Sequence, residues 1–401
     1  MEERIRLKRQ AEKRRSVGKR KVTERRRAVA GLKETDFFLI ATVFALVMFG
    51  LLMVYSASSY RNITNGADAY GDFLRQGIFA AGGIVVMFGV STFDYHKYTK
   101  SRTFWALIVT IFLCVLVLAF PARNNAHRWI ILPFISFQPS EIAKYAIVMY
   151  LANLLRHVGN PRKKSTSLIF TGLGFVALLA VIIIEVQSNL SVGAIIFLAA
   201  MSMVFVSGAN LWFVGVPALL GTAGLAGAMV FTPYRMKRFT GFLEPFADPT
   251  GSTHQLVQSL YALASGGIFG RGLSMSRLKA FWLPEAHNDF IFAVVCEELG
   301  LLGGLALILL LVLLIYRGVR IAYLAKDPLG CLMATGITAV LTFQSVINIA
   351  VVIGAFPVTG VTLPFISAGG TSLMVNLVAV GVLLNISRQT RDKVQKKTVR
   401  A

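Results

Sequence analysis

The chain has 401 residues, of which 55% are hydrophobic and 15% are charged. A water-soluble domain could not bury so much apolar surface, so the composition excludes that class and predicts an all-α polytopic membrane protein. The net charge of +22 includes a strongly basic stretch over residues 1–34. Beside a first span, such a stretch favours a cytoplasmic tail that contacts anionic lipid, and we expect no nucleic acid as a partner.

Uncharged apolar runs indicate the membrane spans, because a helix needs about 20 apolar residues to cross a bilayer. The first two spans are expected at about residues 37–57 and 73–90, and the longest runs hold two spans each. Counting along the chain predicts ten transmembrane helices. In order, the runs are Phe37 to Tyr60, Gln76 to Phe93, Thr103 to Ala122, Val186 to Tyr234, Leu299 to Tyr316 and Pro328 to Ser387.

Short basic loops indicate the orientation of these spans. Residues 94–102, 156–164 and 317–326 carry Lys and Arg, which favours the cytoplasmic side of the membrane. Both termini are then cytoplasmic. The expected organisation is a basic tail at 1–34, a ten-helix domain at 35–388 and a second basic tail at 389–401.

A polar motif begins the fourth span. Pro139 suits the first turn of a helix, since its missing N–H is not needed there. Glu141 and Lys144 are three residues apart and so share one helix face. The pair is either a local ion pair at the membrane interface, which the motif alone favours, or part of a site that faces a cavity in the protein.

The segment over residues 233–289 is too polar to span the membrane and lies, by the count of spans, on the outer face between helices seven and eight. Its aromatic, proline and glycine content predicts an ordered loop with tight turns. Cations on this side depart from the usual charge rule, and an anionic ligand such as a phosphate group would explain them. They include Arg235, Arg238, Arg271 and Lys279.

An acid stands where this polar segment gives way to the eighth span. Asp289 can be the N-cap of that helix, a position that favours Asp, or a functional carboxylate, and the two roles can hold together. As a cap, it would have its pKa lowered by the positive helix end. His287 beside it either orients the carboxylate or is a solvated loop histidine.

Two further polar features follow toward the C-terminus. Gln344 and Asn348 are four residues apart and lie on one face of the ninth span. Residues 354–370 form a broken segment, rich in proline and glycine, on the outer side. Ser367 in this segment either lines the same cavity as the acid or serves packing.

Several long motifs occur in order: Arg128-Trp-Ile130, Phe137-Gln-Pro-Ser-Glu-Ile-Ala-Lys144, Leu283-Pro-Glu-Ala-His-Asn-Asp-Phe-Ile-Phe-Ala293 and Pro357-Val-Thr-Gly-Val-Thr-Leu-Pro-Phe-Ile-Ser367. Over essentially the whole chain beyond the basic tail, they resemble the SEDS family (shape, elongation, division and sporulation), which includes FtsW, RodA and SpoVE. The motifs are more similar to the FtsW and SpoVE branch. Where the family usually has Gln-Pro-Asp-Leu-Gly-Thr, this chain has Gln187-Ser-Asn-Leu-Ser-Val192, so a role for that turn is carried over only for Gln187.

This resemblance implies a peptidoglycan glycosyltransferase of the bacterial cytoplasmic membrane, which polymerises lipid II on the outer face during cell division or sporulation. It makes Asp289 the catalytic aspartate, and a sugar hydroxyl that attacks an anomeric carbon does need a base. The departing polyprenyl pyrophosphate needs cations, or a divalent metal such as Mg²⁺ or Mn²⁺, and the sequence leaves the metal open. Candidate residues for binding pyrophosphate or lipid II are Lys144, Glu141, Arg128, Arg235, Arg238, Arg271, Lys279, His287 and Ser367.

The resemblance also implies a partner, a class B penicillin-binding protein with transpeptidase activity, together with other division or sporulation proteins. Among the cations we favour Lys144 as a ligand, because a charge on the face of a span is expected to face protein or a cavity. A lipid II flippase is the main alternative, since transporters also have broken helices and polar residues near the midplane. A RodA-type polymerase for cell elongation and a scaffold for cell-wall synthases are further interpretations.

Overall fold

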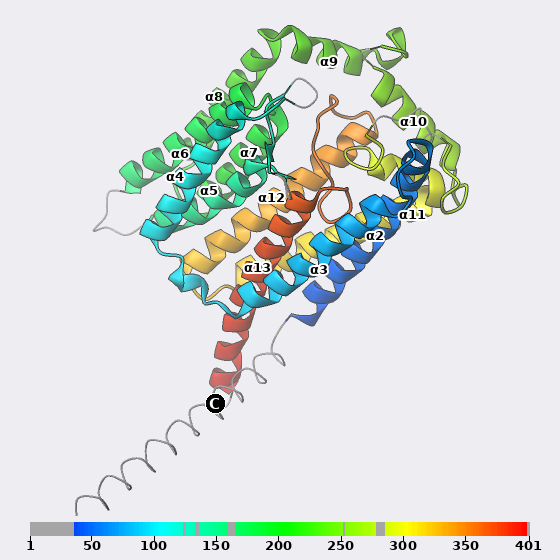
Figure 1. Ribbon diagram of the computed structural model, residues 1–401. Helices are drawn as coiled ribbons and strands as arrows, with labels where there is room; N and C mark the ends of the chain where they lie inside the picture. The colour runs from blue at the N-terminus through cyan, green and yellow to red at the C-terminus, as the bar shows by residue number, and fades with distance from the viewer. Residues whose placement is uncertain are drawn as a thin grey trace, which may run out of the picture.

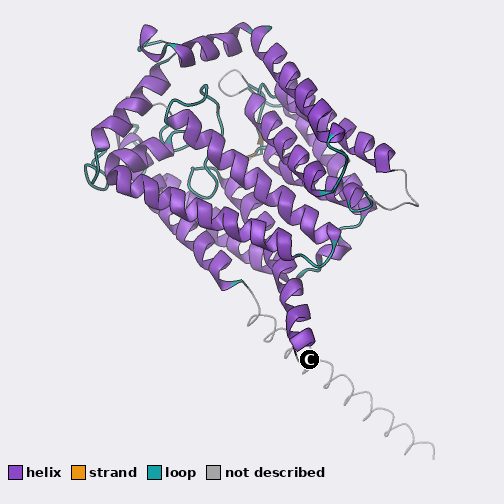
Figure 2. Ribbon diagram, turned by 180° about the vertical axis from the view of Figure 1, so that it is seen from behind, coloured by secondary structure: helices purple, strands orange, loops and turns teal. Residues whose placement is uncertain are grey.

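The computed structural model describes residues 36–122, 126–132, 136–158, 165–251, 253–277 and 285–398. These residues are helical almost throughout (Figure 2). The sheet among them is an antiparallel pair of two short strands, β1 (Ile130–Ile131) and β2 (Ser136–Phe137). The pair lies in the connection that leads into α5 and sets Ile130 opposite Phe137.

The long helices pack side by side as a bundle (Figure 1). Eight helices of the described residues are long and apolar enough to cross a membrane, which confirms a polytopic membrane protein. In chain order the helices are α2 (Phe37–Thr64), α3 (Gly71–Thr92), α4 (Lys100–Leu116), α5 (Pro139–Leu155), α6 (Ser165–Val181), α7 (Leu190–Val206), α8 (Trp212–Val230), α9 (Pro233–Leu243), α10 (His254–Gly266), α11 (Ile291–Leu324), α12 (Pro328–Val352) and α13 (Gly370–Thr398). Short helical pieces are η1 (Tyr95–Lys97), η2 (Val117–Ala119), the π-helical η3 (Ile182–Val186) and η4 (Pro245–Ala247).

Two of the ten expected spans, α5 and α7, are not among these eight helices. α5 and α7 have 17 residues each, and α7 is apolar. α5 carries Glu141 and Lys144, and it is enclosed by α4, α6, α7 and α12, so that nearly all of its residues are buried. A helix surrounded by other helices has little surface to offer to lipid, so its charged residues face the interior of the bundle, where they can pair.

The two ends of the bundle differ in what they carry. α2 begins and α13 ends at one end, which we call the terminal end (Figure 1). α13 begins at the opposite end, and there the N–H of Ala368 donates to the carbonyl of His287 at 2.9 Å. This bond places the residues just before α11 beside the broken segment before α13, and we call this side of the bundle the Asp289 end.

The segment between α8 and α11 crosses the Asp289 end as two helices joined by turns (Figure 1). α9 has no buried residue, and neither does α8, which precedes it. α10 packs against α11. After α10, positive φ angles at Gly267, Gly270 and Gly272 form the tight turns expected from the sequence.

A kink at Gly300 divides α11 and anchors the turns after α10. Gly300 has a φ of +68°, which favours glycine, and it lies directly against the backbone of Gly270. Just before the kink, the buried Glu298 accepts hydrogen bonds from the Ser56 hydroxyl at 2.7 Å and from the Ser274 N–H at 3.0 Å. The start of α11 is thereby tied both to α2 and to the polar segment that precedes it.

Candidate functional site

Asp289 lies in a turn over residues 285–290, directly before α11. The N-cap of α11 is Phe290, and no side chain caps that helix end. The alternative interpretation of Asp289 as the helix cap is therefore wrong. The turn is closed by the N–H groups of Asn288 and Phe290, which donate to the Glu285 carbonyl, and this delays the start of the helix beyond Asp289.

Residues from α12 and from the broken segment hold this turn in place. Asn348 donates from Nδ2 to the carbonyls of both Asp289 and Val361, each at 2.7 Å. The Ser367 hydroxyl donates to the carbonyl of Asn288 at 2.7 Å and accepts from the N–H of Leu363 at 2.7 Å. Ser367 is buried, and these two bonds position the backbone of the turn, in line with the packing interpretation.

Two arginines and a glycine surround the Asp289 carboxylate. A Cβ atom placed on Gly360 would lie 3.3 Å from Asp289 Oδ2 and 3.3 Å from Arg128 Nη1. Arg238 donates from Nη1 to the carbonyl of Val358, two residues earlier in the same segment, at 3.1 Å. The loop before α5, the helix α9, the turn before α11 and the broken segment therefore meet here, and we call Asp289, Arg128, Arg238 and Gly360 the Asp289 site.

Arg128 is held by the turn that departs from the family pattern. Its Nε donates to the Gln187 carbonyl at 2.9 Å, and its Nη2 donates to the Ser188 carbonyl at 2.7 Å. Ser188 has a φ of +49°, so the turn is tight. The guanidinium is thus fixed by two backbone acceptors, which leaves Nη1 directed toward Gly360 and Asp289.

The Asp289 carboxylate has an unusual environment for an acid. Asp289 is half-buried, and the described residues include no hydrogen-bond or ion-pair partner for its carboxylate oxygens. Burial raises the pKa of Asp289 to about 7, and the Glu285 carboxylate adds to this rise, against the opposing effect of Arg128 and Arg238. An acid that titrates near neutral pH beside cations is suited to accept and release a proton.

Lys144 lies in a buried polar chain rather than beside Asp289. Its ammonium donates to Glu141 Oε2 at 2.9 Å and to Gln344 Oε1 at 2.6 Å, and only 1% of the side chain is exposed. Gln344 in turn donates from Nε2 to the Thr362 carbonyl at 2.9 Å. The shared face of Glu141 and Lys144 is confirmed, and this chain links α5 and α12 to the broken segment.

Two of the three remaining predicted cations, Arg235 and Arg271, are engaged elsewhere in the molecule. Arg235 forms an ion pair with Glu185 at 3.1 Å, at the end of η3. Arg271 Nε lies 4.0 Å from the buried carboxylate of Glu297, so it supports the start of α11. Lys279 lies outside the described residues.

His287 is directed away from the acid. Its Nε2 lies 3.4 Å from Arg61 Nη2, at the end of α2, and Arg61 is also 3.7 Å from the carboxylate of Asp72. Burial and the charge of Arg61 lower the pKa of His287. Its main contribution to the site is its carbonyl, which accepts from Ala368 and fixes the turn.

Sequence reasoning did not assign a role to Asn348 or Gly360. For Asn348 there was a signal in its four-residue spacing from Gln344, because both side chains reach the broken segment from one face of α12. Nothing in the sequence distinguishes Gly360 from the neighbouring glycines. Among the described residues, no group of three or more His, Cys, Asp or Glu side chains is placed to hold a metal ion.

Comparisons with known proteins agree with this architecture. A family model for cell cycle proteins, named for FtsW, RodA and SpoVE, matches residues 37–392. Stage V sporulation protein E of Bacillus subtilis is 42% identical over 366 residues, which cover 89% of this chain and 98% of that protein. A "Probable peptidoglycan glycosyltransferase FtsW" of Trichlorobacter lovleyi is 40% identical over 368 residues, which cover 89% of this chain and 94% of that protein.

Solved structures share the fold. One, described as showing structural coordination of polymerization and crosslinking by a peptidoglycan synthase complex, superposes with a TM-score of 0.71 at 25% identity. That match covers 89% of this chain and 98% of the other. The rod shape determining protein RodA of Thermus thermophilus matches with a TM-score of 0.64 at 25% identity, over 88% of this chain and 97% of RodA.

Proposed function

Because this chain belongs to the FtsW/RodA/SpoVE family of cell cycle proteins, we propose that it acts as a peptidoglycan glycosyltransferase of the FtsW/SpoVE type. The substrate is lipid II, a disaccharide-pentapeptide linked to a polyprenyl pyrophosphate. The observation that carries the proposal is the Asp289 site, an acid with a pKa of about 7 beside two fixed guanidinium groups.

In the proposed reaction, a sugar hydroxyl of one lipid-linked glycan attacks the anomeric carbon of another. The new bond joins the hydroxyl oxygen to that carbon, and the bond from the carbon to the pyrophosphate oxygen breaks. Asp289, in its ionised form, accepts the proton of the attacking hydroxyl. Arg128 and Arg238 are placed to stabilise the negative charge that develops on the leaving pyrophosphate, as guanidinium groups do through paired hydrogen bonds.

The fixed position of Arg128 favours this role. Its Nε and Nη2 are occupied by the carbonyls of Gln187 and Ser188, so the group is oriented before any substrate arrives. A preorganised cation needs no rearrangement as charge develops in the transition state. The buried hydrogen bond from Lys144 to Gln344 supports the site indirectly, because Gln344 in turn holds Thr362 in the broken segment.

We further propose ten membrane spans, with α5 and α7 crossing inside the bundle and the Asp289 end facing outward. The terminal end carries Lys97, Lys100 and Arg102 after α3 and Lys326 after α11, and cations of short loops favour the cytoplasmic side. With ten spans both ends of the chain lie on that side. The lipid-linked donor then meets Asp289 at the outer surface of the membrane.

The partner that we propose is a class B penicillin-binding protein, a transpeptidase that cross-links the new strands. The solved peptidoglycan synthase complex supports this, since its description joins polymerization to crosslinking and its fold matches this chain. Division and sporulation are both represented among the relatives. The proposal covers the polymerising step that both processes need.

The decisive experiment is polymerisation of purified lipid II by the full-length protein with its transpeptidase partner in detergent. Detergent removes the two sides of a membrane, so a flippase has no transport to perform there. We expect Asp289→Ala to form no glycan polymer, while Asp68→Asn, an exposed acid at the same end, remains active. Asp289→Ala activity equal to wild type overturns the base, and wild-type protein that moves lipid II across liposomes without ever polymerising it is a flippase.

A further inference from the structure

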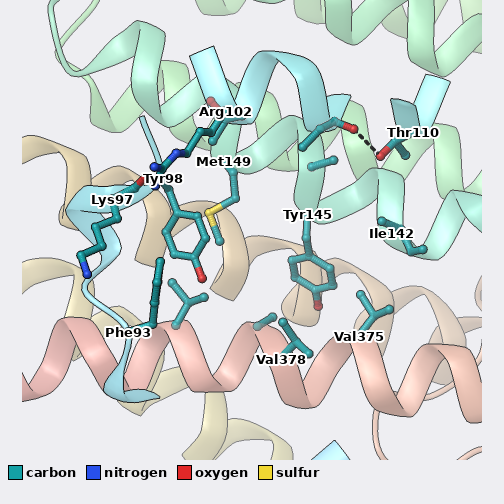
Figure 3. A pocket seen from close by; sticks show the side chains of 15 residues that line it. Phe93, Lys97, Tyr98, Arg102, Thr110, Ile142, Tyr145, Met149, Val375 and Val378 are labelled. Atoms are coloured by element: carbon teal, nitrogen blue, oxygen red, sulfur yellow. Dashed lines mark hydrogen bonds between the residues drawn. The ribbon is translucent and has the colours of Figure 1, made fainter. Parts of the chain in front are cut away.

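A cavity lies away from the Asp289 site, between α4, α5 and α13. It has a volume of about 500 Å³, within the range of small-molecule sites. Figure 3 shows Lys97 and Arg102 toward one end of this cavity and Thr110, Ile142 and Val375 toward the other. Lys97 and Arg102 flank the start of α4, so the first end is at the terminal end of the bundle.

The interior of this cavity offers little to a polar ligand. Its walls are mainly aliphatic and aromatic, with Ala146 and Met149 of α5 among them. Three of the four hydroxyls in the lining are already used within the protein: Thr103 donates to the Thr99 carbonyl at 3.1 Å, Thr110 donates to the Ala106 carbonyl at 2.7 Å (Figure 3), and Tyr145 donates to Asn376 at 2.7 Å. The occupant that fits these walls is a hydrocarbon chain.

Lys97 and Arg102, at the terminal end of this cavity, are held in place but have no acidic partner in the described part of the chain. Arg102 donates from Nη1 to the Lys97 carbonyl at 3.1 Å, and the Lys97 ammonium lies over the Phe93 ring, 5.0 Å from its centre. Both side chains are exposed. Two positive charges therefore stand at one mouth of an apolar cavity, where a phosphate would complement them.

We propose that this cavity binds an anionic phospholipid of the inner leaflet, with one acyl chain between α4 and α13 and its phosphate between Lys97 and Arg102. The inner-leaflet placement rests on the orientation proposed above. The lipid would fill the space between α4, which packs on α5, and α13, which packs on α3. It would thereby join two parts of the bundle at the end opposite the Asp289 site.

The charge distribution argues against the polyprenyl tail of the substrate as the occupant. A donor whose pyrophosphate lies at the Asp289 site has its charge at the far side of the bundle, and α4 alone, with 17 residues, is about 25 Å long. The tail of such a donor would bring only hydrocarbon to Lys97 and Arg102. A phospholipid that enters from the terminal end satisfies both the apolar walls and the two cations.

The test is native mass spectrometry of the full-length protein, titrated with phosphatidylglycerol and with phosphatidylcholine that carries the same acyl chains. We expect one phosphatidylglycerol to bind more tightly than phosphatidylcholine. The double variant Lys97→Gln/Arg102→Gln should lower the affinity for phosphatidylglycerol about 25-fold, since each cation near an anionic headgroup contributes about fivefold. The matched double variant Lys100→Gln/Lys326→Gln removes the same charge from the terminal end outside the cavity and should change the affinity less than twofold.

A second pair of variants tests the apolar walls. Ala146→Phe fills the cavity and should weaken both lipids, and Ala106→Phe, at an exposed position of the lining, replaces it if the first variant does not fold. Equal binding of the two lipids by wild-type protein overturns the proposal. So does an equal loss in the matched control, which would indicate general surface charge, or one-for-one displacement of the phospholipid by undecaprenyl pyrophosphate, which would assign the cavity to the substrate.

These results are separable from the proposed function. The Lys97→Gln/Arg102→Gln variant leaves every residue of the Asp289 site in place, so its lipid II polymerisation can be measured beside its lipid binding. Loss of phosphatidylglycerol binding with polymer still formed supports the lipid site. Failure of wild-type protein to polymerise would count against the proposed function and leave the lipid titration to decide this proposal alone.

Discussion

Two acids at opposite ends of the bundle, Asp94 and Asp289, are used in opposite ways. At the terminal end, Asp94 Oδ1 accepts from the His96 ring at 2.8 Å and from Gln389 at 2.9 Å. Asp327 accepts from the Tyr95 hydroxyl at 2.6 Å, so the α3–α4 connection is tied to the turn before α12. At the other end, the described residues offer Asp289 no such donor.

The pKa values of the two acids follow from this difference. Burial acts to raise the pKa of Asp94, but hydrogen bonds from Gln389 and His96 lower it to about 2. For Asp289, burial acts without compensating donors, and the pKa rises to about 7. The first carboxylate is committed to holding the fold, whereas the second keeps a proton that it can exchange at neutral pH.

The sharpest test of this contrast exchanges each acid for its amide. Asp289→Asn keeps the shape of the side chain but removes the base, so polymerisation should fall about 10²–10⁴-fold. Asp94→Asn should keep polymerisation within about twofold, because its carboxylate lies at the end of the bundle opposite the reaction. Initial rates of glycan formation from lipid II measure both, and comparable losses in the two variants would remove the distinction between the ends.

The pH dependence of polymerisation gives a second test. Only ionised Asp289 accepts a proton, so with a pKa of about 7 the rate should fall about tenfold for each pH unit below that value and level off above it. Rates measured from pH 5 to 9 on one preparation, with folding monitored throughout, provide the profile. A midpoint near pH 4, the ordinary range for Asp, would show that burial does not raise the pKa of Asp289.

A third prediction concerns the space between Asp289 and Arg128. Gly360→Ala adds a methyl group 3.3 Å from an oxygen of one and a nitrogen of the other, where the pyrophosphate-linked sugar is proposed to bind. We expect kcat/KM to fall on the order of tenfold while the protein stays folded. Gly71→Ala is the matched control, since a methyl group there meets no atom within 4 Å. Unchanged kinetics in Gly360→Ala would place the substrate elsewhere.

The helices of the bundle could be predicted because an apolar run in the sequence marks its own span. Long apolar runs gave α2, α3, α11 and α12, and the run from Val186 to Tyr234 was long enough to hold both α7 and α8. α5 has no long apolar run of its own, and the helices around it decide what each of its faces contacts. A hydropathy argument cannot report which helices enclose another.

The site was predictable only in part, for a similar reason. The motif around Asp289 identified the acid, but its partners come from distant parts of the chain, such as the Gln187 carbonyl, 59 residues from Arg128. The N-cap interpretation was wrong because the bonds to the Glu285 carbonyl were not visible in the sequence. Lys144 carried a motif signal, yet its burial against Gln344, 200 residues away, was not available from spacing.

The smallest expected effects are on stability, and they should have opposite signs at the two ends. The folded protein holds the Asp289 proton more tightly than the unfolded chain, whose ordinary pKa is 3.8, so this acid lowers stability progressively as pH rises toward about 7. Asp289→Asn should therefore raise the unfolding temperature at pH 8, by roughly 2–4 °C, and give no gain near pH 4.

Asp94 binds its proton less tightly when folded, so its contribution is present above about pH 4 and is lost as pH falls toward 2. Asp94→Asn should lower the unfolding temperature at pH 8, and thermal scans of both variants at the two pH values measure the pair. Destabilisation by Asp289→Asn at pH 8 would show that this carboxylate, like that of Asp94, serves the fold.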